Sequence, residues 1–267
     1  MIGIIGAMDC EVSLLLSQMT GVSDGRVGAH TFYTGELAGC RCVLARCGVG
    51  KVNAAACAAL MIEKYRPAAI INTGVGGGLA PDLSIGELVV ADALCEHDLI
   101  YGILGDKRGT VFYPDGREII MLPTDKTVTG MIAEAASSLG IPCRRGIIAS
   151  GDRFVDSAEV KQDIRAEFGA DVCEMEGAAI AQVAFAMGVP FAVLRSVSDL
   201  ADGSAPESFG KFAEESAGVA ARVLSGALPS IAAAEAKKQR LNDSRFYIYW
   251  DSTAGRVPLN QPFSRFH

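Results

Sequence analysis

The sequence predicts an α/β protein in which helices are layered around a mainly parallel sheet. Short β-branched runs alternate with longer helix-like segments along the chain, which is typical of α/β layered folds. The short runs are almost continuously apolar, and such runs indicate strands that are buried on both faces of a parallel sheet. With 267 residues, the chain forms one large domain or two small ones and can bury a sizeable core.

The individual elements follow one another through residue 228. Strands are expected at residues 1–8, 42–47, 68–74, 86–92, 145–151 and 191–199. Helices are expected at Glu11–Met19, Lys51–Tyr65, Lys126–Leu139, Ala158–Phe168, Glu176–Met187 and Glu207–Leu228. Ser157 is expected to cap the helix from Ala158, and Ser204–Glu207 has the pattern of a capping box with proline in the first turn.

The composition changes near residue 230, where the helix-prone segment becomes rich in alanine and lysine. We therefore expect one domain over residues 1–230 and a C-terminal extension over residues 231–267. The extension ends in a short polar segment with six aromatic residues, including the only tryptophan. A docked or partly mobile extension is the simpler interpretation, and a partner-binding segment is the alternative.

Charge and composition exclude several classes of protein. The net charge of -7 argues against a nucleic-acid-binding protein, which needs an excess of lysine and arginine. No apolar run reaches the roughly 18 residues that a membrane helix needs, and the first residues do not resemble a signal peptide. The eight cysteines lack zinc-binding spacing, which favours reduced, buried thiols in a cytoplasmic protein and no metal site.

The segment from Cys173 to Asp202 carries the densest cluster of candidate functional residues. Glu174 and Glu176 stand at the expected start of an apolar helix, and Arg195 with Asp199 lies at the end of an expected buried strand. Charges in such places lose hydration and need a partner or a function. Helix capping or ion pairing could explain any one of these residues. It is the presence of all of them at the strand ends that indicates a site.

Other strand ends add candidates. Glu11 follows the first strand and either stabilises a helix N-terminus or serves as a general base toward water. The glycine-rich segment Asn72–Leu79 lacks the dinucleotide-binding spacing, and we expect a turn shaped around a sugar there, with a structural tight turn as the alternative. Gly48–Lys51 is half of a P-loop, which favours Lys51 as a first-turn helix residue over a phosphate ligand.

Taken together, these motifs resemble the methylthioadenosine/S-adenosylhomocysteine nucleosidases of the nucleoside phosphorylase superfamily. The motifs are GIIGAM-x-x-E-V, GVGKVNAA, IINTG-x-x-GGL, VVAD, SGD-x-F, EMEGAAIA and R-x-x-SD, in this order through about residue 228. The resemblance implies a three-layer αβα sandwich around a central mixed twisted sheet, and a homodimer. It also implies hydrolysis of the N-glycosidic bond of 5′-substituted adenosines, with release of adenine and without a metal or organic cofactor.

The same resemblance implies roles for individual residues. Glu11 corresponds to the base that activates water, Glu176 to the carboxylate that holds the ribose hydroxyls, and Asp199 to the acid that protonates adenine N7. Ser198 orients that acid, Arg195 lies near the water and ribose, and Met175 lies against the sugar. The remaining substrate-binding residues are the base-binding Phe154 and Val155, the 5′-pocket residues Met8, Val49 and Phe209, and Val75, Gly77 and Glu174.

Two departures from the family pattern concern the substrate. Val75 stands where the family often has serine, and residues 99–116 lack the family's usual aromatic loop; Ile100, Tyr101 and Ile103 are candidate replacements. Two alternative functions remain: a phosphorolytic purine nucleoside phosphorylase and a non-catalytic nucleoside-binding protein. The absence of arginine from the first-strand turn, which carries Asp9 and Glu11, disfavours phosphate.

Overall fold

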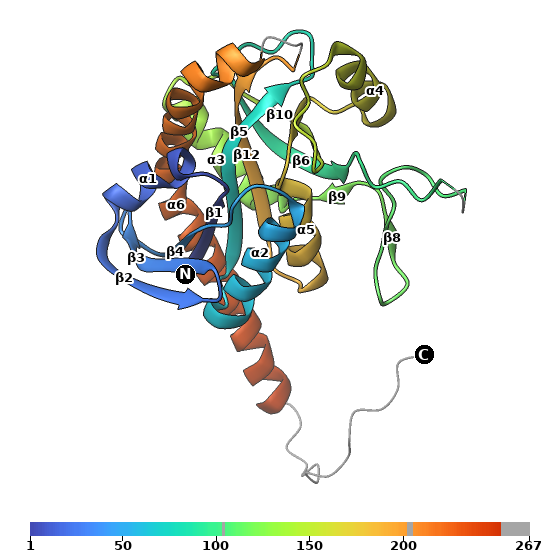
Figure 1. Ribbon diagram of the computed structural model, residues 1–267. Coiled ribbons are helices and arrows are strands. Elements are labelled where there is room, and N and C mark those ends of the chain that lie inside the picture. The colour runs from blue at the N-terminus through green and yellow to red at the C-terminus, as the bar shows by residue number, and fades with distance from the viewer. Residues whose placement is uncertain (103–104, 202–204, 252–267) are drawn as a thin grey trace. The chain divides into compact units, whose positions relative to one another are not determined.

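The computed structural model describes residues 1–102, 105–201 and 205–251, with side chains described for residues 1–102, 105–201 and 212–238 (Figure 1). The chain divides into two units, Met1–Ala232 and Ala233–His267. The sheet and all the candidate functional side chains that are described belong to the first unit. The boundary that we expect near residue 230, between a catalytic domain and an extension, stays a prediction.

A 10-stranded mixed sheet runs through the first unit, in the order β11-β10-β6-β12-β5-β1-β4-β3-β2, with β9 paired to β6. β1 pairs in parallel with β4 and β5, and β5 pairs in parallel with β12. β11 pairs in parallel with β10 and antiparallel with β5, so this half of the sheet closes on itself. The strands are β1 Ile2–Gly6, β2 Thr20–Val27, β3 His30–Leu37, β4 Cys40–Arg46, β5 Ala69–Gly78, β6 Leu88–Glu96, β9 Leu122–Pro123, β10 Cys143–Ser150, β11 Val172–Glu174 and β12 Phe191–Asp199; the short pair β7 (Val111–Phe112) and β8 (Glu118–Ile119) is separate.

Helices cover both faces of the sheet, which confirms the three-layer αβα sandwich (Figure 1). The helices α2 (Lys51–Tyr65) and α5 (Gly177–Ala186) pack on one face, and α1 (Asp9–Gln18), α3 (Lys126–Ser138) and the first unit's part of α6 (Ala205–Asp251) pack on the other. α4 (Ala158–Phe168) packs in a third, smaller cluster.

The two main cores show why the strands are so apolar. Ile2 and Ile4 of β1 belong to the core under α1, α3 and α6, whereas Ile5 belongs to the core under α2 and α5. Side chains alternate across a strand, so a strand with helices on both faces needs apolar residues at nearly every position.

The structure contains strands that the sequence did not predict. β2 and β3 form an antiparallel edge, and most residues of β2 are exposed. Their polar composition, TGVSDGRV in β2, hides them from a search for buried strands.

The glycine-rich segment after Asn72 is also different from the expectation. It is not a turn, because β5 continues as a buried strand through Gly78. A Cβ atom on Gly74 would collide with the Glu11 carboxylate, and one on Gly76 would collide with Val172. These glycines therefore leave room for neighbouring side chains and backbone rather than forming a turn.

Two smaller expectations need correction. Ser157 stands at the N-cap of α4, but its side chain makes no capping hydrogen bond. One helical segment, Phe212–Lys238, is long and apolar enough to cross a membrane, although we expected no such segment. Val223, Leu224 and Leu228 of this segment are buried in the core on the sheet, so a core helix explains its composition and it is weak evidence for a membrane span.

Candidate active site

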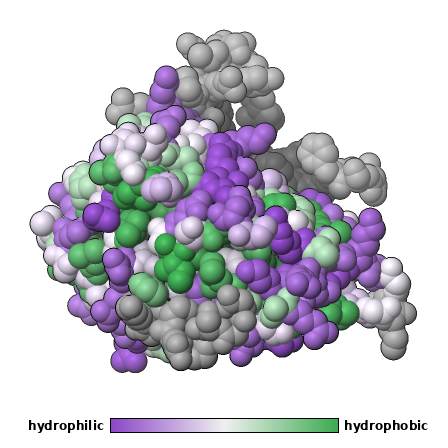
Figure 2. All heavy atoms as spheres, turned by 90° about the horizontal axis from the view of Figure 1, so that it is seen from above, coloured by the Kyte–Doolittle hydropathy of each residue, from purple (hydrophilic) through white to green (hydrophobic). Residues whose placement is uncertain are grey.

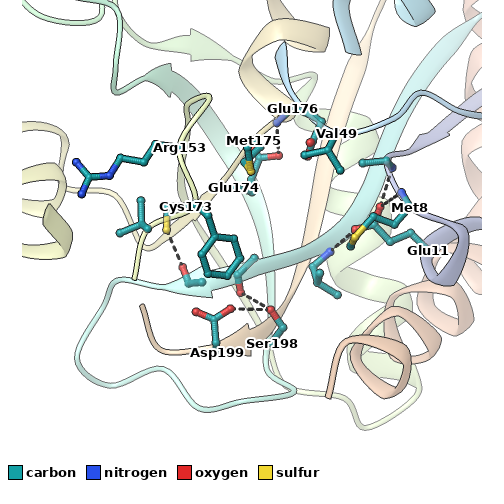
Figure 3. A pocket seen from close by; sticks show the side chains of 16 residues that line it. Met8, Glu11, Val49, Arg153, Cys173, Glu174, Met175, Glu176, Ser198 and Asp199 are labelled. Carbon is teal, nitrogen blue, oxygen red and sulfur yellow. Dashed lines mark hydrogen bonds between the residues drawn. The ribbon is translucent and has the colours of Figure 1, made fainter. Parts of the chain in front are cut away.

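A cavity of about 260 Å³ lies where several strands of the sheet end. Figure 2 shows the molecule from above, with apolar patches beside a band of hydrophilic side chains. Glu11, Glu176 and Asp199 reach the cavity from three different sides (Figure 3). The lining residues are Ala7, Met8, Glu11, Val49, Val75, Gly76, Gly77, Arg153, Phe154, Val155, Cys173, Glu174, Met175, Glu176, Ser198 and Asp199.

Glu11 is held by backbone donors at the start of α1. One carboxylate oxygen, Oε2, accepts the N–H groups of Ala7 at 2.6 Å and Met8 at 2.9 Å, and Oε1 accepts the N–H of Val75 at 3.0 Å. Burial raises the pKa of Glu11, although the charge of Arg195 and these hydrogen bonds act to lower it. The side chain therefore caps the helix and also lines the cavity, so both interpretations of Glu11 hold at once.

Glu176 precedes α5 and turns its carboxylate toward the loop before α2. Its Oε1 accepts the N–H of Gly50 at 2.9 Å. Burial and the neighbouring charge of Glu174 raise the pKa of Glu176 to about 7. This carboxyl group therefore titrates near neutral pH, which is a common property of functional carboxylates.

Glu174 differs from Glu176 although only one residue separates them. Its oxygens accept the backbone N–H groups of Glu176 and Gly177, the hydroxyl of Ser150, and the guanidinium of Arg195. Glu174 borders the cavity, but its carboxylate oxygens already accept hydrogen bonds from protein groups. Its position supports a structural role beneath Glu176.

Arg195 is the residue whose position differs most from the expectation. Only 1% of it is exposed, and it is not among the residues that line the cavity. Its Nη2 donates to Asn72 Oδ1 at 2.5 Å and to Glu174, and lies 4.0 Å from Glu176 Oε2. Arg195 thus neutralises buried carboxylates from behind the cavity wall.

β12 ends with Ser198 and Asp199, which lie across the cavity from Glu176 (Figure 3). The hydroxyl of Ser198 donates to Asp199 Oδ2 at 2.9 Å, and the N–H of Ala201 donates to Oδ1 at 3.0 Å. Only 2% of Asp199 is exposed. Gly77 packs directly on it, since a Cβ there would lie 3.0 Å from Asp199 Oδ1.

Apolar side chains complete the cavity between these carboxylates. Phe154 and Val155 line it, and Met8, Val49 and Met175 border it near Glu11 and Glu176 (Figure 3). Phe154 and Val49 are 46% and 49% exposed, so the cavity has an open, apolar rim. The side chain of Phe209 lies outside the described residues.

The comparisons with known proteins point to one family. The sequence model of the Phosphorylase superfamily matches residues 1–229. A 5′-methylthioadenosine/S-adenosylhomocysteine nucleosidase from Halalkalibacterium halodurans is 39% identical over 219 residues, which cover 80% of this chain and 91% of the relative. The chain belongs to the methylthioadenosine/S-adenosylhomocysteine nucleosidases of this superfamily.

Solved structures of nucleosidases are similar to this chain in fold and in sequence. A nucleosidase of the same name from Neisseria meningitidis, in complex with methylthio-immucillin-A, has a TM-score of 0.82 and 37% identity, covering 86% of this chain and 98% of that one. The futalosine hydrolase of Helicobacter pylori has a TM-score of 0.80 and 35% identity, covering 86% and 97%. The family and fold that the sequence motifs predict are therefore confirmed.

Four residues that line the nucleosidase cavity were not predicted from the sequence, namely Ala7, Gly76, Arg153 and Cys173. Each is a direct neighbour of a predicted site residue, so extending the motifs by one position would have found them. Among the described residues, no cluster of three or more His, Cys, Asp or Glu side chains could hold a metal ion. All eight cysteines are free.

Proposed function

We propose that this chain hydrolyses the N-glycosidic bond of 5′-substituted adenosines and releases adenine. The substrate class follows from the family, whose members are named for methylthioadenosine and S-adenosylhomocysteine. The single observation that carries the mechanism is the convergence of Glu11, Glu176 and Asp199 on one cavity, each buried and each with different hydrogen-bond partners. This distribution suits three different roles around one sugar–purine bond.

The base leaves from the side of the cavity that holds Asp199. Adenine is a poor leaving group as an anion, so N7 must gain a proton as the bond to C1′ breaks. Asp199 supplies that proton, and Ser198 holds the carboxyl group through the hydrogen bond to Oδ2. Phe154 and Val155 provide an apolar wall for the purine ring.

The sugar lies against Glu176 and Met175. Glu176 accepts the ribose hydroxyl hydrogen bonds, and its negative charge stabilises the oxocarbenium-like sugar as the bond breaks. Glu11 removes a proton from the water that attacks C1′, and its raised pKa makes it a stronger base than an exposed glutamate. Met8 and Val49 give the 5′ substituent apolar contacts.

Phosphorolysis is the closest alternative, because the superfamily is named for phosphorylases. A phosphate nucleophile needs cations and hydroxyl groups where the water would lie. In the described part of the cavity, Glu11 and the apolar Val75 occupy that side, and Arg195 is turned away into its network with Glu174. This arrangement favours water.

The test is a substrate panel followed by free adenine. We expect methylthioadenosine, adenosylhomocysteine and 5′-deoxyadenosine to release adenine, and inosine to react poorly. Aminodeoxyfutalosine belongs in the panel because a futalosine hydrolase is among the similar structures. If none of the adenosines is cleaved while the protein binds them tightly, the chain is a nucleoside-binding protein and the hydrolase proposal fails.

The proposal includes a cytoplasmic homodimer. Val52 on α2 is 79% exposed and Ile100 is 65% exposed, and Tyr101 with Phe112 adds exposed aromatic rings. Val52, Tyr101 and Phe112 line one surface pocket, and a contiguous exposed apolar surface supports an interface. Free thiols are typical of a reducing compartment. We expect light scattering to give a dimer mass that Val52→Glu reduces to a monomer; a monomeric wild type would exclude this assembly.

A further inference from the structure

Lys51 forms an ion-pair cluster beside the cavity that the proposed mechanism does not use. Its Nζ donates to Glu96 Oε2 at 2.7 Å and to Asp98 Oδ1 at 2.5 Å. Only 17% of the Lys51 side chain and 5% of that of Glu96 are exposed. Burial alone would lower the pKa of Lys51, but the hydrogen bonds to Asp98 and Glu96 raise it, so this lysine stays charged.

The backbone of Lys51 is held as firmly as its side chain. Lys51 is the first residue of α2, and the N-cap position is Gly50, which has no side chain to accept a hydrogen bond. Asp152, from a loop about 100 residues later, takes the place of the cap, because its Oδ1 accepts the Lys51 N–H at 2.8 Å. Asp98 in turn accepts the N–H of Asp152 at 2.7 Å. Lys51, Glu96, Asp98 and Asp152 form what we call the Lys51 clamp.

The Lys51 clamp connects the segment that contacts Glu176 with the loop that carries Phe154 and Val155. Gly50, directly before Lys51, donates its N–H to Glu176 Oε1 at 2.9 Å. Gly50 has φ 97°, which a residue with a side chain rarely adopts, so this position favours glycine. Asp152 shortly precedes Phe154 and Val155, which also line the cavity.

We propose that Lys51 and Asp152 are positioning residues, which hold the Gly50 N–H against the sugar-binding carboxylate Glu176 and fix the 152–155 loop at the base end. This inference rests on the proposed role of Glu176 toward the ribose. It also assigns a purpose to the half P-loop Gly48–Lys51: the lysine binds protein carboxylates instead of a phosphate. Lys51 and Asp152 touch no substrate and act through Gly50 and the loop.

The test compares two aspartates that cap helices. Asp152→Ala removes the cap of α2, and Asp125→Ala removes the cap of α3, where Asp125 Oδ1 accepts the N–H groups of Thr127 and Val128. Both variants should lower the melting temperature by a similar, small amount. Only Asp152→Ala should lower kcat/KM for methylthioadenosine, by about 10- to 100-fold, since a small misplacement near a reacting group has effects of this size. Asp152→Asn keeps an acceptor oxygen and should restore most of the activity.

Two further measurements separate positioning from general damage. With a 3′-deoxy analogue of methylthioadenosine, the kcat/KM values of wild type and Asp152→Ala should differ by much less than with methylthioadenosine itself. The reason is that the analogue lacks one of the hydroxyl groups that Glu176 holds. Hydrogen exchange of the amides around Gly50 should accelerate in Asp152→Ala but not in Asp125→Ala.

Each outcome decides the question. Equal kinetic losses in Asp152→Ala and Asp125→Ala, or unchanged kinetics and exchange in Asp152→Ala, would overturn the positioning role. If the wild type releases no adenine, the proposed function fails, and the exchange rates at Gly50 still decide whether the Lys51 clamp holds this loop.

Discussion

The sugar end and the base end of the cavity are built from different kinds of hydrogen bond. At the sugar end, backbone N–H groups hold Glu11 and Glu176. At the base end, the hydroxyl of Ser198 holds one oxygen of Asp199, and a backbone N–H holds the other. Backbone donors only donate and point in fixed directions, whereas a hydroxyl rotates and either donates or accepts.

This difference distinguishes the two carboxylates at the sugar end from the acid that gives its proton to the base. Fixed donors favour the ionised form of a carboxylate, in which Glu176 stabilises a positive sugar and Glu11 is ready to accept a proton from the attacking water. An acid that gives its proton to adenine and regains one needs a partner that can hydrogen-bond to both the protonated and the ionised carboxyl group. A serine hydroxyl can do so, because it either accepts or donates. The contrast thus assigns the acid to the base end of the cavity.

The largest expected effect is at the base end. Asp199→Asn cannot donate the proton to N7, so adenine release from methylthioadenosine should fall by about 100- to 10,000-fold. The melting temperature should stay close to that of the wild type, because asparagine keeps an acceptor for the Ala201 N–H. Steady-state adenine release and thermal unfolding check this, and a variant with near-wild-type turnover would remove Asp199 from its role.

Glu11→Gln tests the sugar end. The variant should lose at least about 100-fold in kcat, because no other described carboxylate is held beside Val75 to activate the water. Glutamine also replaces one acceptor oxygen with a donor, so we expect a modest loss of stability. Adenine binding, measured by calorimetry, should be unchanged since the base end is intact. Surviving turnover would mean that water has another base.

Ser198→Ala sharpens the comparison with a smaller effect. It removes the hydroxyl that donates to Asp199 Oδ2 and leaves the Ala201 N–H in place. A hydrogen bond to an ionised group contributes about 1.5–3 kcal/mol, so kcat should fall about 10- to 100-fold. An unchanged rate would show that the rotating hydroxyl is not needed.

The smallest expected effect concerns stability and pH. Burial, then the charge of Glu174, raises the pKa of Glu176 to about 7, well above the ordinary value of a glutamate, so the folded state binds this proton more tightly than the unfolded state. The stability that this contributes is present at low pH and is lost as the pH rises toward 7. Glu176→Gln should therefore raise the melting temperature by a few degrees at pH 8 and by less at pH 5, as thermal unfolding would show. A destabilised variant at pH 8 would contradict the pKa shift.

The sequence predicted the fold and most of the cavity for a clear physical reason. The central strand β1 is apolar throughout, and the first half of β12 is apolar, so the polar residues that end β12 stand out. β2 was not predicted because an exposed edge strand carries no such signal. The glycines of β5 were misread because their neighbour Glu11 is over 60 residues away in the sequence. The separate environments of Glu174 and Glu176 likewise depend on Arg195 and Gly50, which only the fold brings together.

The central claim is that Glu11, Glu176 and Asp199 direct water, and no other nucleophile, to a purine nucleoside. The most direct measurement is the rate of adenine release from methylthioadenosine by the purified protein, with and without phosphate. Equal rates, with free methylthioribose as the sugar product in both, are the predicted result. Release that requires phosphate and yields a sugar phosphate would contradict the account.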